Sequence, residues 1–290
     1  MNNHTLENVA KTINSYLENA AGAKKTVALY FFENLEDIAF LTLDEISRHI
    51  DVSASTITRT ASEMGFRRYP DLQNLVRSGI KAKLGDPADR LKKAKVTDVA
   101  ESFRASLECE KDNITRLMKL NPLEKFEQAT ALVTKARKVH LYGVQTSHGP
   151  ILMFGCYLAQ IRPDVHRLDL MNMDMAAQYL DITAEDVMLV VSLPRYHTVT
   201  AATADEAVRR GCPLISITDS IYSPLALKST VAFAVPYRSV GFFHSQVAVC
   251  SLLNALFAGI NLTIKDEAVR RLEEHTDLLS RWNLTVEPGH

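Results

Sequence analysis

Short apolar runs that alternate with helical stretches are the feature of this sequence that most constrains its fold. The runs are VHLYGV, VMLVVS, PLISIT and VAFAVP, at residues 139–144, 187–192, 213–218 and 231–236. Helical patterns lie between and after them, at residues 148–161, 199–210 and 244–260. Strands that are apolar at nearly every position are typical of a parallel sheet with helices on both faces. The pattern therefore predicts an α/β domain, with a weaker strand at 164–168.

The first part of the chain has helical patterns throughout and no alternating strand pattern. The predicted helices span residues 5–19, 22–33, 42–50, 54–64 and 70–83. Thr42 and Glu45 fit a capping box, in which each side chain accepts a hydrogen bond from the backbone amide of the other residue. Gly65 is suited to end one helix and Pro70 to begin the next. We therefore predict an all-α domain before the α/β domain.

A change in local composition marks the boundary between these two domains. Gly85, Asp86 and Pro87 favour a linker, and residues 59–95 hold 10 basic against four acidic side chains. Because the whole chain has a formal net charge of −1, any nucleic-acid-binding surface has to be local. We expect an amino-terminal domain at 1–84, a linker at 85–97 and a carboxyl-terminal domain at 98–290.

Residues 41–69 have the pattern of a helix-turn-helix. Two short helices that meet across a tight turn at residues 51–53 would bury Ile46, Ile50, Val52, Ile57, Ala61 and Met64 together. The second helix then exposes hydroxyls and a guanidinium near its amino end, which suits a helix that enters the major groove of DNA. Arginines neutralise phosphates, whereas Ala54 or Thr58 would be nearest the base edges. The predicted DNA-binding residues are Ser53, Thr56, Thr58, Arg59, Arg67 and Arg68.

An alternative is that these helices form a structural bundle or a dimerisation domain whose charged face is merely solvated. The predicted recognition helix carries no lysine, so the argument for DNA binding depends on its hydroxyls and on nearby arginines. A steep fall of DNA affinity with salt would support binding through phosphates.

Two polar loops follow the predicted strands at 139–144 and 187–192. Ligands of open parallel sheets bind at the carboxyl ends of the strands, where the strand order reverses. Each loop precedes a helix, whose free backbone amides favour an anion, and the second loop adds an arginine. Helix amino ends from both loops would converge on one cleft. The predicted ligand-binding residues are Gly143, Gln145, Ser147, Ser192, Arg195, Tyr196, His197, Thr198 and Thr200.

Each loop by itself could instead do no more than cap the next helix. Asp219, His244 and Ser245 are further positions that would either join the cleft or act as caps. For His197 we expect a polar orienting role rather than general-base catalysis. The sequence has no zinc-binding His-Glu motif, nucleophile elbow or P-loop. We therefore expect no catalytic residue, no metal and no cofactor.

Cysteine spacing and apolar segments indicate the compartment. Cys109, Cys156, Cys212 and Cys250 are too far apart for a paired redox or zinc motif and do not suggest a disulfide framework. The longest apolar runs fall well short of the roughly 20 residues of a membrane-spanning helix. The amino-terminal residues lack the apolar centre of a signal peptide. We therefore expect a cytoplasmic protein with no membrane partner.

Taken together, the two halves resemble the RpiR/MurR family of bacterial transcription regulators. The segment DVSASTITRTASEMGFRRYPDL is similar to the helix-turn-helix pattern of that family, with Thr56 and Arg59 at the matching positions. KVHLYGVQTS, DVMLVVSLPRYHTVT, GCPLISITDSIYSPLA and the helix from Ser245 resemble successive pieces of its sugar isomerase (SIS) domain. The resemblance covers nearly the whole chain and implies a SIS-type α/β domain that binds an effector and forms oligomers.

The sequence departs from the family in both loops. SIS domains that bind sugar phosphates commonly have Gly-x-Gly-x-Ser in the first loop and Ser-x-Ser-Gly-x-Thr in the second. Here Gln145 stands in the first loop, and Pro194, Arg195 and Tyr196 stand where Ser-Gly would lie in the second. Ser147 and Ser192 alone match cleanly. The resemblance therefore implies an anionic ligand that an arginine contacts, without fixing its identity.

The function implied is a DNA-binding transcriptional regulator whose SIS domain senses a small anionic metabolite, either a sugar phosphate or a sugar acid. One recognition helix reads few base pairs, so we expect a homodimer or homotetramer on a palindromic double-stranded operator, with paired helices roughly 34 Å apart. One alternative is a SIS-type sugar-phosphate isomerase with an appended helical domain, for which His197 is the available base. Another is a sheet domain that only assembles oligomers, which predicts no ligand-induced thermal shift.

Overall fold

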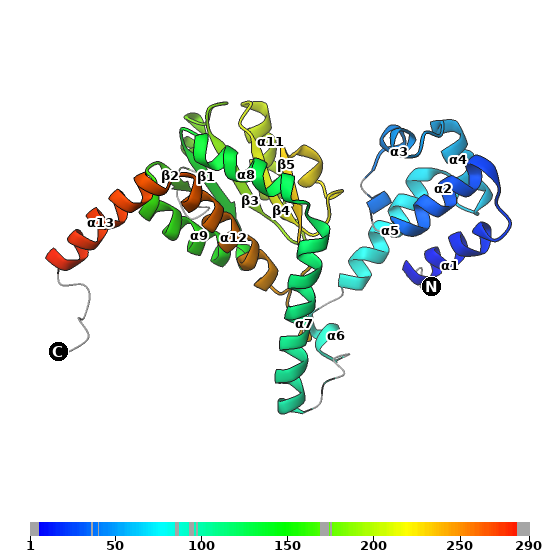
Figure 1. Ribbon diagram of the computed structural model, residues 1–290. Coiled ribbons are helices and arrows are strands. Elements are labelled where there is room, and N and C mark those ends of the chain that lie inside the picture. Colours follow the sequence, from blue (N-terminus) through cyan, green and yellow to red (C-terminus); the bar gives the residue numbers. More distant parts are fainter. Residues whose placement is uncertain are drawn as a thin grey trace. The chain divides into compact units, whose positions relative to one another are not determined.

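The computed structural model describes residues 6–35, 37–39, 41–84, 87–92, 96, 98–168, 174 and 176–282. Its contacts divide the chain into two compact units, Met1–Lys95 and Val96–His290 (Figure 1). The first unit is helical and the second contains a parallel sheet. Both predicted fold classes are thus confirmed.

Each predicted helix of the first unit is present. The elements are α1 (Leu6–Leu17), α2 (Gly22–Glu33), the short 3-10 helix η1 (Asp37–Ala39), α3 (Leu43–Ile50), α4 (Ala54–Glu63), α5 (Tyr69–Leu84) and α6 (Pro87–Lys92). Helix α6 lies in the range predicted as a linker. Gly85 and Asp86, on which that prediction depended, lie outside the described residues.

Apolar side chains and one polar seam hold the first unit together. Ile46, Ile57 and Ala61 of the predicted core are fully buried, whereas Ile50 and Val52 are half-buried. The Tyr69 hydroxyl lies 2.8 Å from the carbonyl oxygens of both Ile38 and Leu41, and Arg77 Nε donates to the Ala39 carbonyl at 2.7 Å. Because buried loop carbonyls need hydrogen-bond partners, these contacts fasten α5 to the η1 segment.

The second unit is built on a five-stranded parallel sheet with strand order β2-β1-β3-β4-β5. Its strands are β1 (Val139–Gly143), β2 (Val165–Arg167), β3 (Val187–Val191), β4 (Leu214–Thr218) and β5 (Val231–Ala234). Its helices are α7 (Val99–Leu120), α8 (Leu123–Lys135), η2 (Gln145–Ser147), α9 (His148–Ile161), α10 (Ala177–Leu180), α11 (Thr198–Arg209), η3 (Ala226–Lys228), α12 (Val247–Thr263) and α13 (Lys265–Arg281). The weak strand at 164–168 is therefore an edge strand.

Alternate residues of each strand enter opposite layers of the core. Leu141, Leu189 and Ile215 belong to the larger apolar cluster, which includes residues of α8, α9 and α12. Tyr142 and Val190, one residue further along, belong to a smaller cluster that includes residues of α11. Helices thus cover both faces of the sheet (Figure 1), which explains why the strand sequences are apolar throughout.

One prediction about a boundary was wrong. The last helical pattern was expected to begin at residue 244, but α12 begins at Val247 and extends to Thr263. Ser245 lies before the helix, and its hydroxyl accepts a hydrogen bond from the Val247 amide at 3.1 Å. The polar residues before Val247 therefore form a loop at the end of the sheet.

No single helix among the described residues is long and apolar enough to span a membrane. Helices α12 and α13 meet the length and composition criterion only as a pair, and they bend by 103° at their junction.

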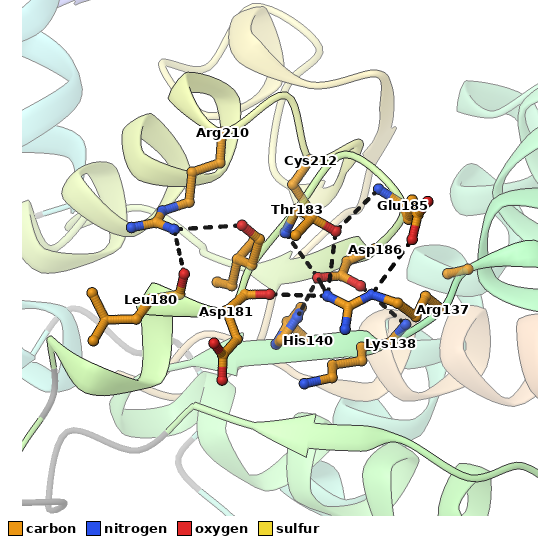
Figure 2. Close-up of polar contacts among 12 residues, drawn as sticks. Arg137, Lys138, His140, Leu180, Asp181, Thr183, Glu185, Asp186, Arg210 and Cys212 are labelled. Carbon is orange, nitrogen blue, oxygen red and sulfur yellow. Dashed lines mark hydrogen bonds and ion pairs between the residues drawn. The ribbon is translucent and has the colours of Figure 1, made fainter.

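The buried Asp186 carboxylate joins the amino ends of β1 and β3 (Figure 2). It accepts hydrogen bonds from the Thr183 and Lys138 amides, at 2.9 and 3.2 Å, and from the Arg137 guanidinium at 2.9 Å. Burial by itself raises the pKa of the Asp186 carboxyl, but these hydrogen bonds, the His140 ring and the Arg137 charge together hold the pKa below its usual value. The network therefore keeps a buried charge at this edge of the sheet.

His140 completes the Asp186 network from β1. Its Nε2 atom lies 3.3 Å from the Asp186 carboxylate, and its ring centre lies 5.6 Å from that of His166 on β2. Burial lowers the pKa of His140, and this effect outweighs the opposing effect of Asp186. A neutral ring donates from Nε2 to the carboxylate and leaves Nδ1 buried without a hydrogen-bond partner.

Candidate functional site

Helices α3 and α4 form the predicted helix-turn-helix. The Thr42 hydroxyl accepts from the Glu45 amide at 3.2 Å, and the Glu45 carboxylate accepts from the Thr42 amide at 2.7 Å, which confirms the capping box. These hydrogen bonds from Thr42 lower the pKa of the Glu45 carboxyl. Helix α3 ends at Ile50. The next residue, Asp51, has a left-handed φ of 51°, and the turn leads directly to the cap of α4.

Hydroxyl groups at the amino end of α4 bond mainly to their own helix. Ser53 Oγ accepts from the Thr56 amide at 3.3 Å and lies 2.9 Å from the Thr56 hydroxyl. The Thr58 hydroxyl donates to the Ala54 carbonyl at 2.9 Å, so its oxygen remains available as an acceptor. Ser53 is exposed, and Thr56 and Thr58 are half-buried. The predicted DNA-binding hydroxyls therefore lie together at one end of α4.

The three predicted arginines are all exposed on the first unit, but they lie on two different segments of it. Arg59 is exposed on α4, and Arg67 and Arg68 are exposed in the segment between α4 and α5. Arg68 Nε lies 3.6 Å from the Asp71 carboxylate, so a neighbouring acid partly balances its charge. Of the three, Arg59 is closest in sequence to the Ser53 cap.

The carboxyl end of α4 is held by contacts that sequence reasoning missed. Glu63 accepts hydrogen bonds from the Tyr16 hydroxyl at 2.6 Å and from Lys24 Nζ at 2.7 Å. Burial, together with the hydrogen bond and the charge of Glu63, raises the pKa of Tyr16 to about 12. Because Tyr16 and Lys24 come from α1 and α2, they fasten α4 at the end opposite Ser53. No local sequence pattern relates these three residues.

The loops after β1 and β3 start at neighbouring positions. The chain crosses from β1 outward to β2 and from β3 outward to β4 and β5, so the strand order reverses between β1 and β3. The register pairs Gly143 with Val191 at the carboxyl ends of these strands. The structure therefore brings both predicted ligand-binding loops to the same edge of the sheet.

The first loop requires glycine at its start. A Cβ atom on Gly143 would lie 2.7 Å from the Ser147 carbonyl oxygen and 3.0 Å from the Ile151 side chain. Gln145 adopts a left-handed φ of 51° and is exposed. Ser147 is buried immediately before α9. The loop thus turns closely over the end of β1 before the helix begins.

The second loop contains a strained arginine and a tyrosine-aspartate contact. Arg195 is exposed and has a φ of 73°, which is costly for a residue with a Cβ atom. The Tyr196 hydroxyl donates to Asp219 Oδ1 at 2.7 Å, which ties this loop to the end of β4. Ser192 is buried at the end of β3. Asp219 therefore belongs to this edge.

The remaining predicted residues of the second loop begin α11. His197 precedes the helix but makes no side-chain capping hydrogen bond. Thr198 is exposed, whereas Thr200 is buried and its Oγ1 atom has no hydrogen-bond partner. An unpaired buried hydroxyl is unusual in a folded protein. It is one of the groups at this edge that could bind a ligand.

A third loop, residues 236–246 between β5 and α12, also reaches this edge. Gln246 Nε2 lies 3.5 Å from the Thr146 hydroxyl of the first loop, and Gln246 Oε1 is buried without a partner. The Ser245 hydroxyl donates to the Glu110 carboxylate at 2.7 Å, and Asn113 donates to the Arg238 carbonyl at 2.8 Å. Helix α7 therefore holds this loop in place.

The roles of His244 and Ser245 differ from each other. The His244 ring lies 4.7 Å from the Tyr237 ring within the loop, and Ser245 caps α12 while it contacts α7. Sequence reasoning placed Ser245 near the site but missed Glu110 and Gln246. The pairing of Ser245 with Glu110 joins residues 135 positions apart, and no spacing pattern signals it.

The chemistry of this edge suits a small anion. Two helix amino ends, the Arg195 guanidinium and several hydroxyls supply hydrogen-bond donors and positive potential. Among the residues that the structure describes, no group of three or more His, Cys, Asp or Glu side chains is arranged to hold a metal ion. The edge therefore has the features of a binding site for an anion.

Comparison with protein families assigns both units. Residues 7–83 match the helix-turn-helix domain of the rpiR family, and residues 132–259 match the SIS domain. An uncharacterized HTH-type transcriptional regulator of Haemophilus influenzae is 22% identical over 226 residues, which are 75% of this chain and 76% of that protein.

Two solved structures share the fold. The sugar isomerase domain of an RpiR transcription factor from Sphaerobacter thermophilus has a TM-score of 0.57 at 24% identity, covering 59% of this chain and 96% of that chain. The NanR protein of Vibrio vulnificus, in complex with ManNAc-6P, has a TM-score of 0.57 at 19% identity, covering 93% of this chain and 98% of that chain. The chain therefore joins a helix-turn-helix domain of the rpiR family to a SIS domain.

Proposed function

We propose that this protein is a DNA-binding transcriptional regulator whose second unit senses a small anionic metabolite. The observation that carries the proposal is the presence of an rpiR-family helix-turn-helix domain and a SIS domain in one chain. A DNA-binding domain and a ligand-binding domain can each act alone. Their presence in one chain suits a protein in which the ligand controls DNA binding. The effector would favour one arrangement of the DNA-binding units through its differential affinity.

In this proposal α4 enters the major groove of double-stranded DNA. Arg59, Arg67 and Arg68 would contact phosphates, and Thr56 and Thr58 would lie near the base edges. Ser53 would face the phosphate backbone at the amino end of the helix. A homodimer or homotetramer would bind a palindromic operator through two such helices.

The effector would bind at the carboxyl edge of the sheet. Its anionic group would contact Arg195 and the amino ends of α9 and α11, near Gly143, Gln145 and Ser147 of the first loop. The rest of the second loop would shape the site through Ser192, Tyr196, His197, Thr198 and Thr200. The ManNAc-6P ligand of the NanR protein supports a sugar phosphate, and a sugar acid is the other candidate.

The second candidate function is a sugar-phosphate isomerase, because the shared fold includes a sugar isomerase domain. An isomerase needs a positioned base beside the reacting carbon. Asp219 and Glu110 are already bonded to Tyr196 and Ser245, which leaves His197 as the candidate base. We therefore favour a regulator that is not an enzyme. Turnover of a sugar phosphate by the purified protein would reverse this preference.

We further propose a DNA-binding domain at 1–84, a linker at 85–97 and an effector-binding domain at 98–290. We place the protein in the cytoplasm, and the four free cysteines are consistent with a reducing compartment.

The DNA-binding half of the proposal is tested with a labelled duplex from the region upstream of the protein's own gene. Anisotropy should report binding that weakens steeply with salt. Arg59→Ala should lower the affinity about tenfold and reduce the salt slope by about one. The matched control is Arg270→Ala, since Arg270 is an exposed helical arginine of the second unit. No binding at low salt, or equal effects of the two variants, would contradict the proposal.

The sensing half is tested by a thermal-shift screen of phosphorylated sugars and sugar acids. A ligand that binds only the folded protein raises its melting temperature, by an amount that grows with the logarithm of the ligand concentration relative to the dissociation constant. The active compound is then added to the protein-DNA complex, and a change in DNA affinity is expected. A stabilising ligand that leaves DNA affinity unchanged would count against a regulatory role.

A further inference from the structure

Helix α7 carries an apolar stripe that its own unit leaves exposed. The helix spans 22 residues, from Val99 to Leu120, and Figure 1 shows its amino-terminal half extending past the rest of the second unit. Five large apolar side chains lie within about 100° of one another around the helix axis. They are Val99, Phe103, Leu107, Ile114 and Met118, and between 38% and 88% of each is exposed. We refer to these five residues as the α7 stripe.

The side of α7 that borders the stripe already has a structural role. Asn113 and Leu117 are buried, and Asn113 bonds to the Arg238 carbonyl of the loop between β5 and α12. Glu110 accepts from Ser245 of the same loop. The packed side of α7 therefore borders the α7 stripe, and the five residues of the stripe remain exposed beside it.

Exposed apolar surface of this size is typical of an interaction site. A fully exposed side chain of this kind has an accessible area of roughly 150 to 200 Å². With the exposed fractions given above, the exposed apolar area of the α7 stripe is roughly 500 Å². Two such stripes would bury about 1,000 Å² in total, which is near the lower limit for a specific protein interface.

The spacing of the stripe is self-complementary. A two-fold axis that passes beside the helix, level with the point between Glu108 and Cys109, places Val99 opposite Met118 and Phe103 opposite Ile114 of a second, antiparallel helix. The two Leu107 side chains then lie beside each other near the axis. A two-fold interface requires that one surface fit itself, and this arrangement pairs apolar residues on both sides of the axis. Near the axis Leu107 lies opposite Glu110, whose carboxylate is bonded to Ser245 and Asn113 of its own chain.

We propose that the α7 stripe pairs with the α7 stripe of a second copy of this chain, in antiparallel orientation, and forms the dimer interface of the second unit. The inference rests on the dimer in the proposed function and names its surface. Each paired helix would hold the loop between β5 and α12 on the side that borders the stripe. Helix α7 would thus contact both the dimer interface and the loop that reaches the proposed effector site.

The first test is the oligomeric state of the full-length protein by sedimentation velocity, without DNA or effector. The wild type should sediment with twice the chain mass. Phe103→Glu should raise the dissociation constant at least tenfold, because a charge would be buried against apolar partners. Leu262→Glu is the matched control, since Leu262 is an apolar residue on α12 that is at least as exposed as Phe103, and it should leave the mass unchanged.

Several results would overturn the assignment. A wild type that is monomeric at high micromolar concentration would do so, and so would a Phe103→Glu variant that remains as dimeric as the control. The latter is expected if the first unit of the same chain, or another protein, covers the stripe. Circular dichroism and thermal unfolding of the variants ensure that a change in mass is not caused by misfolding.

Disulfide crosslinking tests the antiparallel orientation. In a background where Cys109 and Cys156 are replaced by serine, Phe103→Cys combined with Ile114→Cys should form a covalent dimer. The two positions are about 16 Å apart on one helix, too far for a bridge within the chain. Each single substitution should leave the chain uncrosslinked. Crosslinking by either single variant, or none by the pair, would overturn the register. Because no DNA or effector is involved, these results are independent of the proposed regulatory function.

Discussion

The amino edge of the central sheet, where its parallel strands begin, and the carboxyl edge, where they end, differ in the hydrogen bonding of their buried polar groups. At the amino edge the Asp186 carboxylate receives hydrogen bonds from Thr183, Lys138 and Arg137, and His140 Nδ1 is the exception that lacks a partner. At the carboxyl edge Thr200 Oγ1 and Gln246 Oε1 are buried without partners. The comparison teaches that the amino edge is organised for stability, whereas the carboxyl edge leaves bonding capacity for a ligand.

Backbone conformation divides the two edges less sharply. Asp164, directly before β2 at the amino edge, has a left-handed φ of 57°. Gln145 and Arg195, one in each loop of the carboxyl edge, adopt left-handed φ values of 51° and 73°. Such conformations are costly for residues with a Cβ atom, and they are concentrated at functional sites. Because Asp adopts a left-handed φ more readily than Gln or Arg, the costlier backbone conformations lie in the loops of the proposed effector site.

The largest expected effect is a loss of stability at the amino edge. Asp186→Ala should lower the free energy of unfolding by about 3 kcal/mol, because Arg137, His140 and two backbone amides lose their acceptor. Asp219→Ala at the carboxyl edge should cost about 1 kcal/mol, since that carboxylate is half-buried. Urea denaturation combined with hydrogen exchange of β1 and β3 measures both. Equal losses of unfolding free energy in the two variants would contradict the proposed difference between the two edges.

The next effect concerns the anion contact. Arg195→Ala should weaken effector binding by about 30-fold, because a charge-assisted hydrogen bond is lost, and should leave DNA affinity unchanged. Calorimetric titration with the compound found by thermal shift measures the change. Arg209→Ala, on the exposed side of α11, is the control for loss of a positive charge. Unchanged effector sensitivity of Arg195→Ala would refute the loop assignment.

A smaller effect of opposite sign is expected at the unpaired hydroxyl. Thr200→Val should raise the free energy of unfolding by about 1 kcal/mol, because it removes a buried polar atom that has no partner, and should weaken effector binding. Thr203→Val should instead destabilise, since the Thr203 hydroxyl bonds to Tyr179 and to the Val199 carbonyl. Thermal unfolding of the two variants gives the comparison. Destabilisation by both substitutions would show that the Thr200 hydroxyl has a hydrogen-bond partner in solution.

The smallest effect is the pH dependence that His140 confers. An unfolded histidine titrates near 6.5, and burial lowers the pKa of folded His140 below that value. The unfolded state therefore binds more protons within this window, and stability declines as the pH falls through 6.5. His140→Gln should flatten this part of the stability curve relative to His275→Gln. Identical curves for the two variants would mean that His140 titrates normally despite Asp186, Arg137, Lys138 and His166 around it.

Much of the fold and of the carboxyl edge was predictable because it depends on local patterns. Continuous apolar runs indicated β1, β3, β4 and β5, and the Thr42 capping box marked the start of α3. Parallel strands bring their carboxyl ends to one edge, so loops that follow two neighbouring strands are brought together by topology alone. Gly143 was also predictable, since only a glycine allows that close turn.

The tertiary structure alone decided which distant residues meet. Glu63 with Tyr16 and Lys24, Asp186 with His140, and Glu110 with Ser245 are pairings across separate elements. The amphipathic pattern of α7 likewise does not say which apolar residues are covered. Sequence periodicity reports which side of an element is apolar, because that depends on neighbours along the chain. Hydrogen-bond partners and exposure depend on how elements pack in three dimensions, and no local spacing encodes that.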